Sequence, residues 1–308
     1  MAAKGQFPDE TRDGSFVRQS DTFRRWVRAV PDAEFPAAPS RYHLYVSLAC
    51  PWAHRTIVVR RLKGLEEAIG MTVVDPIRDE RGWRFAPPDL LNGWAFLSEA
   101  YFATDPGYAA RVTVPVLWDT RTRQIVSNSD DDIMRMFETE FDAIGNAQPQ
   151  LYPAELASEI DALNELLYQT VNDGVYRAGF ATSQTAYEAA VRRLFETLDA
   201  MEARLATRRY LFGPQPLETD WRFFVTLVRF DAVYYGHFKC NLRRIADYPN
   251  LFGYLRDLYQ IDGIAATVNF DHIKRHYYYT HDDINPTRIV PLGPLQDLTA
   301  PHGREALG

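Results

Sequence analysis

Cys50 is the residue whose type and position most favour chemistry. The segment 46–55 reads VSLACPWAHR and joins an alternating apolar run to a pattern typical of a helix. Pro51 suits the first helical position, because the N–H that it lacks would have no partner there. The unpaired N–H groups and the dipole of a helix N-terminus stabilise a thiolate. We therefore predict that Cys50 is a nucleophile, with His54 and Arg55 adding positive charge; the alternative is a small buried apolar side chain.

The Cys50 motif has no second cysteine to resolve a disulfide. A thioredoxin-type motif needs a cysteine three residues later, where this chain has Ala53. A mixed disulfide on Cys50 must then be reduced by an outside thiol, for which glutathione is the simplest candidate. Cys240 falls in a region of helical pattern, and we expect it to be structural.

Length and charge limit the classes of function. A chain of 308 residues is long for one domain and has a typical length for two. Its net charge of −7 disfavours a protein that binds nucleic acid or an anionic membrane. We see neither an apolar run long enough to span a membrane nor the core of a secretion signal in the first ten residues. We expect a cytoplasmic protein with a small-molecule partner.

The first half of the chain has the pattern of an α/β domain. Strands are predicted at 43–48 and 72–77 on either side of a helix at 51–63, which makes a parallel β-α-β unit. Two further strands, 112–118 and 125–128, precede a helix that runs to Glu140. This order is that of a thioredoxin-like domain. The apolar residues of the stretch 78–110 do not recur with a helical or strand period, and we expect this stretch to be irregular.

Three features of this half point to a ligand site. Pro115 favours a cis bond that would present the backbone of Val114. Ser129 and Asp130 open the last helix, where free N–H groups either bind a ligand carboxylate or are only capped. Trp83, in the irregular stretch, either covers the cysteine or fills a satellite core.

The second half changes to a helical period. In each of two segments, apolar residues share one face of a helix. The segment 221–238 is apolar on almost all sides, which predicts a central buried helix. Two more helices are predicted at 249–259 and 263–275. We divide the chain into an N-terminal arm (1–40), a thioredoxin-like domain (41–144), an all-helical domain (154–280) and an irregular tail (281–308).

Two further clusters lie in the helical half. His272, His276 and His281 include one pair at helical spacing, but no third well-spaced ligand, so we predict no metal. Tyr176 and the tyrosines at 277–279 either donate hydrogen bonds to an oxygen-bearing aromatic ligand or pack between helices.

Four segments carry a family resemblance. Segments 47–55, 111–119, 178–182 and 269–273 resemble those of the glutathionyl-hydroquinone reductases, the xi class of glutathione transferases. The resemblance covers nearly the whole chain. It implies a thioredoxin-like domain followed by an all-α domain, and a homodimer.

The resemblance also implies a reaction. The Cys50 thiolate would attack the sulfur of a glutathionyl-hydroquinone, whose ring can carry halogens, and release the hydroquinone. A second glutathione would then reduce the mixed disulfide and leave as oxidised glutathione. The positions that match the family's glutathione contacts are Trp83, Arg111 and Val114. Tyr176 and Tyr277 match residues near the hydroquinone, where they would hydrogen-bond the ring oxygens and help to move protons.

One position departs from the family pattern. Ser129-Asp130 stands where the family usually has Glu-Ser to hold the γ-glutamyl end of glutathione. A carboxylate at the second place would repel the ligand's own carboxylate. Two rival functions remain: an omega-like thiol transferase or dehydroascorbate reductase, which would lack the 78–110 insert and the tail, and a non-catalytic binding protein with a decayed glutathione site.

Overall fold

The computed structural model describes residues 10–307, which divide into two compact units. The first unit holds residues 19–150 and 267–276. The second holds the described residues up to 18, together with 151–266 and the chain from 277 onward. The arm predicted at 1–40 is thus shared between the units, and its first nine residues lie outside the described part.

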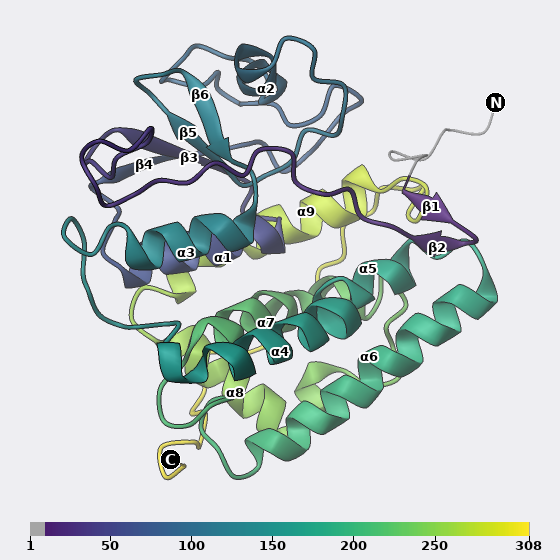
Figure 1. The fold of residues 1–308 in the computed structure, drawn as a ribbon. Helices are drawn as coiled ribbons and strands as arrows, with labels where there is room; N and C mark the ends of the chain where they lie inside the picture. Colours follow the sequence, from purple (N-terminus) through teal and green to yellow (C-terminus); the bar gives the residue numbers. More distant parts are fainter. Residues whose placement is uncertain (1–9, 308) are drawn as a thin grey trace. The chain divides into compact units, whose positions relative to one another are not determined.

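The first unit is built on a four-stranded sheet with the order β4-β3-β5-β6 (Figure 1). β3 (Tyr42–Val46) and β4 (Ile69–Val73) are parallel, and α1 (Pro51–Leu62) connects them. β5 (Val116–Asp119) pairs antiparallel with β3 and with β6 (Gln124–Ser127), and α3 (Asp130–Thr139) follows. The two helices pack against each other. This is the predicted thioredoxin-like order.

Three elements of this unit differ from prediction. The strand predicted at 112–118 is found at 116–119, after Pro115, which has no N–H to donate to a ladder. The strand predicted at 72–77 is found at 69–73, and it ends before Pro76, which has no N–H to donate to a ladder. The stretch 78–110, expected to be irregular, contains α2 (Ser98–Thr104). α2 has only seven residues, too few to display a helical period.

The predicted irregular arm also has ordered parts. Residues up to 18 form the hairpin β1 (Thr11–Arg12) and β2 (Ser15–Phe16) in the second unit. Residues 19–40 belong to the first unit, where the N–H of Arg25 donates to the Val126 carbonyl at 3.0 Å. Val27 is fully buried there. The arm therefore extends the hydrogen bonding of β6.

The second unit is mainly helical. Its longest helices are α4 (Ala157–Leu167), α6 (Gln184–Leu205), α7 (Glu218–Arg229) and α8 (Pro249–Gln260). Its shorter ones are the π-helices Tyr168–Asn172 and Phe230–Tyr234, α5 (Gly174–Gly179), and the 3-10 turns Ala154–Leu156 and Ile245–Asp247. The 3-10 turn Ala265–Thr267 and α9 (Phe270–Thr280) each have residues in both units.

Burial in the second unit confirms the helical pattern. Every residue of α7 is buried, as predicted for a central helix. α9 begins seven residues later than predicted, because the Asn269 side chain accepts a hydrogen bond from the His272 N–H at 2.9 Å and caps the helix there. In the described part of the chain, no helix is long and apolar enough to cross a membrane.

Candidate functional site

Cys50 lies at the N-cap of α1, directly after the loop that follows β3. Its backbone is extended, with φ −75° and ψ 122°, and Pro51 takes the first helical position as predicted. The His54 N–H donates to the Cys50 carbonyl at 3.0 Å, which starts the helical ladder. The Cys50 side chain is half-buried. Its thiol is thus held at a helix N-terminus and remains partly open to solvent.

Val114 provides the backbone that faces this thiol. The Val114–Pro115 peptide bond is cis, as predicted. The Sγ atom of Cys50 donates to the Val114 carbonyl oxygen at 3.7 Å. The loop before β5 and the start of α1 therefore meet at the sulfur, although 64 residues of sequence separate them.

The two residues expected to add positive charge near Cys50 are engaged elsewhere. His54 is fully buried, and its Nε2 lies 2.7 Å from the hydroxyl of Thr267. Arg55 is also buried; its guanidinium stacks 4.6 Å from the Trp52 ring and pairs with the Asp130 carboxylate at 2.8 Å. The charge of Arg55 is therefore compensated by a carboxylate from α3.

Ser129 and Asp130 open α3 in the predicted way. Ser129 is the N-cap, and its hydroxyl accepts a hydrogen bond from the Asp132 N–H at 3.4 Å. The capping alternative therefore describes what the Ser129 side chain does in this structure. Asp130 points its carboxylate at Arg55, with Asp131 at 3.5 Å from the same guanidinium.

Trp83 packs against other side chains, and Arg111 is held through its backbone. Trp83 is buried, and its ring stacks on that of His276 with a centroid distance of 5.0 Å. The guanidinium of Arg78 lies 4.9 Å from the same ring. Arg111 is half-buried, and its carbonyl accepts a hydrogen bond from the Tyr108 hydroxyl at 2.7 Å.

Three tyrosine hydroxyls meet in the second unit. The hydroxyl of Tyr277, from α9, is hydrogen-bonded to that of Tyr176, from α5, and lies 3.1 Å from that of Tyr234. Burial raises the pKa of both Tyr234 and Tyr277 well above 10. These phenols therefore keep their protons at neutral pH and can donate hydrogen bonds.

The sequence analysis did not single out Tyr234, although its position in the chain indicated a buried hydroxyl that needs a partner. Tyr234 lies inside the segment 221–238, which is otherwise almost entirely apolar. A buried phenol there needs a partner for its hydroxyl, and the tyrosine pair supplies it. Gly179 also contributes, because a Cβ there would lie 2.2 Å from the ring of Phe238, which packs on Tyr176.

Comparison with known proteins identifies the family. The family models for the N-terminal and C-terminal domains of glutathione S-transferase match residues 49–140 and 184–257. The chain is 51% identical to "Glutathionyl-hydroquinone reductase YqjG" of Escherichia coli (strain K12), over 97% of this chain and 95% of the relative. The chain belongs to the glutathionyl-hydroquinone reductases, the xi class of glutathione transferases.

Other xi-class proteins agree with this assignment. The chain is 48% identical to "Glutathionyl-hydroquinone reductase PcpF" of Sphingobium chlorophenolicum, over 95% of this chain and 94% of the relative. The solved xi-class transferase of Natrialba magadii superposes with a TM-score of 0.92 at 50% identity, over 97% of this chain and 96% of that one. The glutathione-bound structure of YqjG gives a TM-score of 0.90 at 52% identity, over 92% and 96%.

The departure from the family pattern at Ser129-Asp130 has a neighbour that the sequence argument did not consider. The prediction from sequence treated the Asp130 carboxylate as an uncompensated charge facing the ligand. Its pairing with buried Arg55 offsets that charge locally. The structure thus provides a cation that the sequence argument had not connected with this position.

Two of the three histidines considered as metal ligands have ring nitrogens close to other polar groups. The Nδ1 atom of His276 lies 2.7 Å from the Pro76 carbonyl, and that of His281 lies 3.3 Å from Nε2 of His237. Among residues 10–307, no group of three or more His, Cys, Asp and Glu side chains is arranged to hold a metal ion.

Proposed function

We propose that this chain removes glutathione from glutathionyl-hydroquinones through a mixed disulfide on Cys50. The observation that carries the proposal is the placement of Cys50, half-buried at the N-cap of α1 with its sulfur facing the Val114 carbonyl. Two relatives that are 51% and 48% identical carry the name of this activity, which supports the choice of substrate.

The proposed reaction has two sulfur transfers. The Cys50 thiolate attacks the sulfur of the glutathionyl group, and the bond from sulfur to the ring carbon breaks. The electron pair of that bond stays on the ring, which takes up a proton and leaves as the hydroquinone. The thiolate of a second glutathione then attacks the mixed disulfide, which frees Cys50 and forms oxidised glutathione. The aryl thioether is reduced, and two glutathione sulfurs are oxidised to one disulfide.

The remaining predicted site residues receive roles in this proposal. For binding glutathione we propose Trp83, Arg111, Val114, Ser129 and Asp130. For the hydroquinone we propose Tyr176 and Tyr277, whose hydroxyls are hydrogen-bonded to each other. Burial raises the pKa of Tyr277, so its phenol stays protonated and can donate to a ring oxygen. Tyr234 would position Tyr277 through their hydrogen bond.

The proposal also covers the oligomeric state of the protein and its location in the cell. We propose a homodimer, as the resemblance implies, which light scattering on the purified protein tests. We also propose a cytoplasmic location, because Cys50 must remain a free thiol to react and reducing compartments keep thiols free.

Mass spectrometry gives the most direct test. The protein is mixed with 2-glutathionyl-1,4-hydroquinone without free glutathione, and its intact mass and peptides are measured. We expect one glutathionyl group, located on Cys50, and its loss when glutathione is added. Cys240→Ala should still acquire the group and Cys50→Ser should not. Turnover without any adduct on Cys50, or full activity of Cys50→Ser, would refute the mechanism.

A further inference from the structure

The side chain of Arg18 lies over the ring of Tyr176 in the second unit. The Cζ atom of its guanidinium is 4.7 Å from the centre of that ring and 5.2 Å from the centre of the Phe16 ring. Arginine keeps its proton throughout the pH range of proteins. A cation at this distance is attracted to the face of an aromatic ring. Arg18 therefore places a permanent positive charge beside a phenol that the proposed reaction uses.

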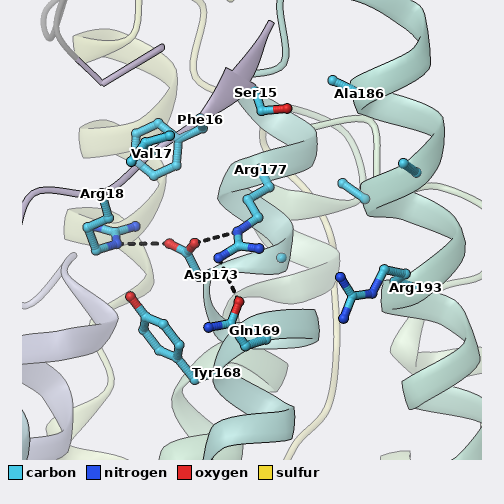
Figure 2. Close-up of a pocket in the computed structure, with 13 residues that line it drawn as sticks. Ser15, Phe16, Val17, Arg18, Tyr168, Gln169, Asp173, Arg177, Ala186 and Arg193 are labelled. Carbon is cyan, nitrogen blue, oxygen red and sulfur yellow. Dashed lines mark hydrogen bonds and ion pairs between the residues drawn. The ribbon is translucent and has the colours of Figure 1, made fainter. Parts of the chain in front are cut away.

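Asp173 holds Arg18 in this position. Asp173 is buried directly before α5, and Nε of Arg18 donates to one of its carboxylate oxygens at 2.9 Å. Nε of Arg177 donates to the other oxygen at 2.8 Å, and Figure 2 shows the carboxylate between the two guanidinium groups. The carbonyl of Asp173 also accepts a hydrogen bond from the Tyr176 N–H at 3.0 Å. Because two cations share one carboxylate, the charge of Arg18 is only partly offset.

The hydroxyls of Tyr176, Tyr234 and Tyr277, here called the tyrosine trio, have different surroundings. Tyr234 and Tyr277 are almost fully buried, and burial raises the pKa of both well above 10. Arg18 faces the ring of Tyr176 instead. A phenolate on Tyr176 would spread its charge over that ring and would accept a hydrogen bond from Tyr277. Of the trio, Tyr176 is therefore the hydroxyl whose loss of a proton is best stabilised.

Other titratable or charged groups lie around Arg18 and the tyrosine trio: Tyr168, Arg229, His237 and His281. Burial outweighs the charge of Arg229, so the pKa of the two most buried phenols stays high. Burial also lowers the pKa of His237 to about 4, so this ring is uncharged at neutral pH. Arg18 differs from these groups because it is a cation that lies directly against Tyr176.

We propose that Arg18, held by Asp173, is a positioning residue that makes Tyr176 the proton donor to the departing ring. This inference rests on the proposed function. When the bond from sulfur to the ring carbon breaks, its electron pair forms a C–H bond with the Tyr176 proton. The negative charge that began on the Cys50 thiolate then lies on the Tyr176 oxygen. Arg18 stabilises this charge until the phenolate takes a proton from water.

Single-turnover kinetics on the full chain test this role. Excess protein is mixed with 2-glutathionyl-1,4-hydroquinone without oxygen or free glutathione, and hydroquinone release and the Cys50 adduct are followed at different pH values. We expect Arg18→Gln to slow release about tenfold at neutral pH. The fall of the rate at alkaline pH should move upward by about half a pH unit, because Tyr176 then holds its proton more tightly. Arg18→Lys keeps the charge and should keep most of the rate.

Two further variants separate this role from a structural one. Arg177→Gln is the matched control, because it removes the other guanidinium from Asp173 and leaves Arg18 over the ring. It should change the rate by less than about threefold. Tyr176→Phe should slow release about tenfold or more. Adding Arg18→Gln to that variant should slow release no further, because a residue that acts through Tyr176 then has no target.

Three results would overturn the inference. Equal slowing by Arg18→Gln and Arg177→Gln would show that the pairing with Asp173 matters and the charge over Tyr176 does not. An equally large effect of Arg18→Gln in the presence and absence of the Tyr176 hydroxyl would show that Arg18 acts elsewhere. Both results leave the chemistry of Cys50 intact. Absence of a Cys50 adduct in the unmodified chain would instead overturn the proposed function and this inference together.

Discussion

Cys50 and Cys240 are chemically the same side chain in opposite surroundings. Cys50 is half-buried at the start of α1, and its sulfur faces one backbone carbonyl. Cys240 is fully buried, and burial raises the pKa of its thiol well above its ordinary value. A helix N-terminus with access to solvent favours the thiolate, whereas packed apolar surroundings favour the thiol. Reactivity is thus assigned by position in the fold and not by residue type.

The largest expected effect on activity comes from removing the Cys50 thiol. Removing the Cys240 thiol should leave activity unchanged. We expect Cys50→Ala to lower kcat for a glutathionyl-hydroquinone by about a thousandfold or more, because the covalent step is lost. Cys240→Ala should keep kcat and KM and lower only the free energy of unfolding, by about 1 kcal/mol. Steady-state kinetics and urea unfolding measure both. A loss of turnover in Cys240→Ala without unfolding would contradict the different roles assigned to the two thiols.

Alkylation should separate the two thiols in the native protein. Iodoacetamide should modify Cys50 at least about a hundredfold faster than Cys240, which reacts only when the structure opens. The Cys50 rate should be half-maximal below about pH 8.5, the ordinary midpoint of a free thiol. Peptide mass spectrometry against time and pH gives both rates. A midpoint at or above that of a free thiol would remove the proposed nucleophile.

Stability at alkaline pH should report on Cys240. In the unfolded chain its thiol loses a proton near pH 9, whereas the folded chain retains it. The unfolded state then binds fewer protons, so the free energy of unfolding should fall as pH rises above 9, by at most about 1.4 kcal/mol per pH unit from this group. Cys240→Ala should make that fall shallower between pH 9 and 10. Cys50→Ala should not, because a thiol that ionises more readily in the folded chain acts in the opposite direction. An identical slope in both variants would contradict the assignment.

The smallest expected effect concerns the charge next to the Cys50 helix. Asp130→Ser would remove the nearer of the two carboxylates that pair with Arg55 and leave Asp131, which lies at 3.5 Å. The gain in positive potential on α1 should lower the alkylation midpoint of Cys50 by a few tenths of a pH unit, about the size expected for a partly compensated charge. Asp142→Ser, which removes a carboxylate paired with Lys63 at the far end of α1, is the control. A rise of the midpoint would contradict this account.

Local sequence signals predicted the elements that carry Cys50. The alternation before residue 48 and the proline at the helix start predicted β3 and α1 closely, because both signals act within a few residues. α2 gave no such signal, because seven residues are too few for a period. The strand predicted at 72–77 was displaced because its apolar residues continue past the point where Pro76 ends the pairing.

Local patterns of residues were enough to predict the nature of the chain: a thioredoxin-like half with one candidate nucleophile at a helix start, then a helical half with one helix buried on all sides. These features depend on residues close together in the chain, so composition and spacing reveal them. Which distant groups meet became known from the folded chain alone. It paired Arg55 with Asp130 across 75 residues and Tyr176 with Tyr277 across 101, and it brought Tyr234 to that pair. Such contacts follow from how helices and strands pack, which no local pattern specifies.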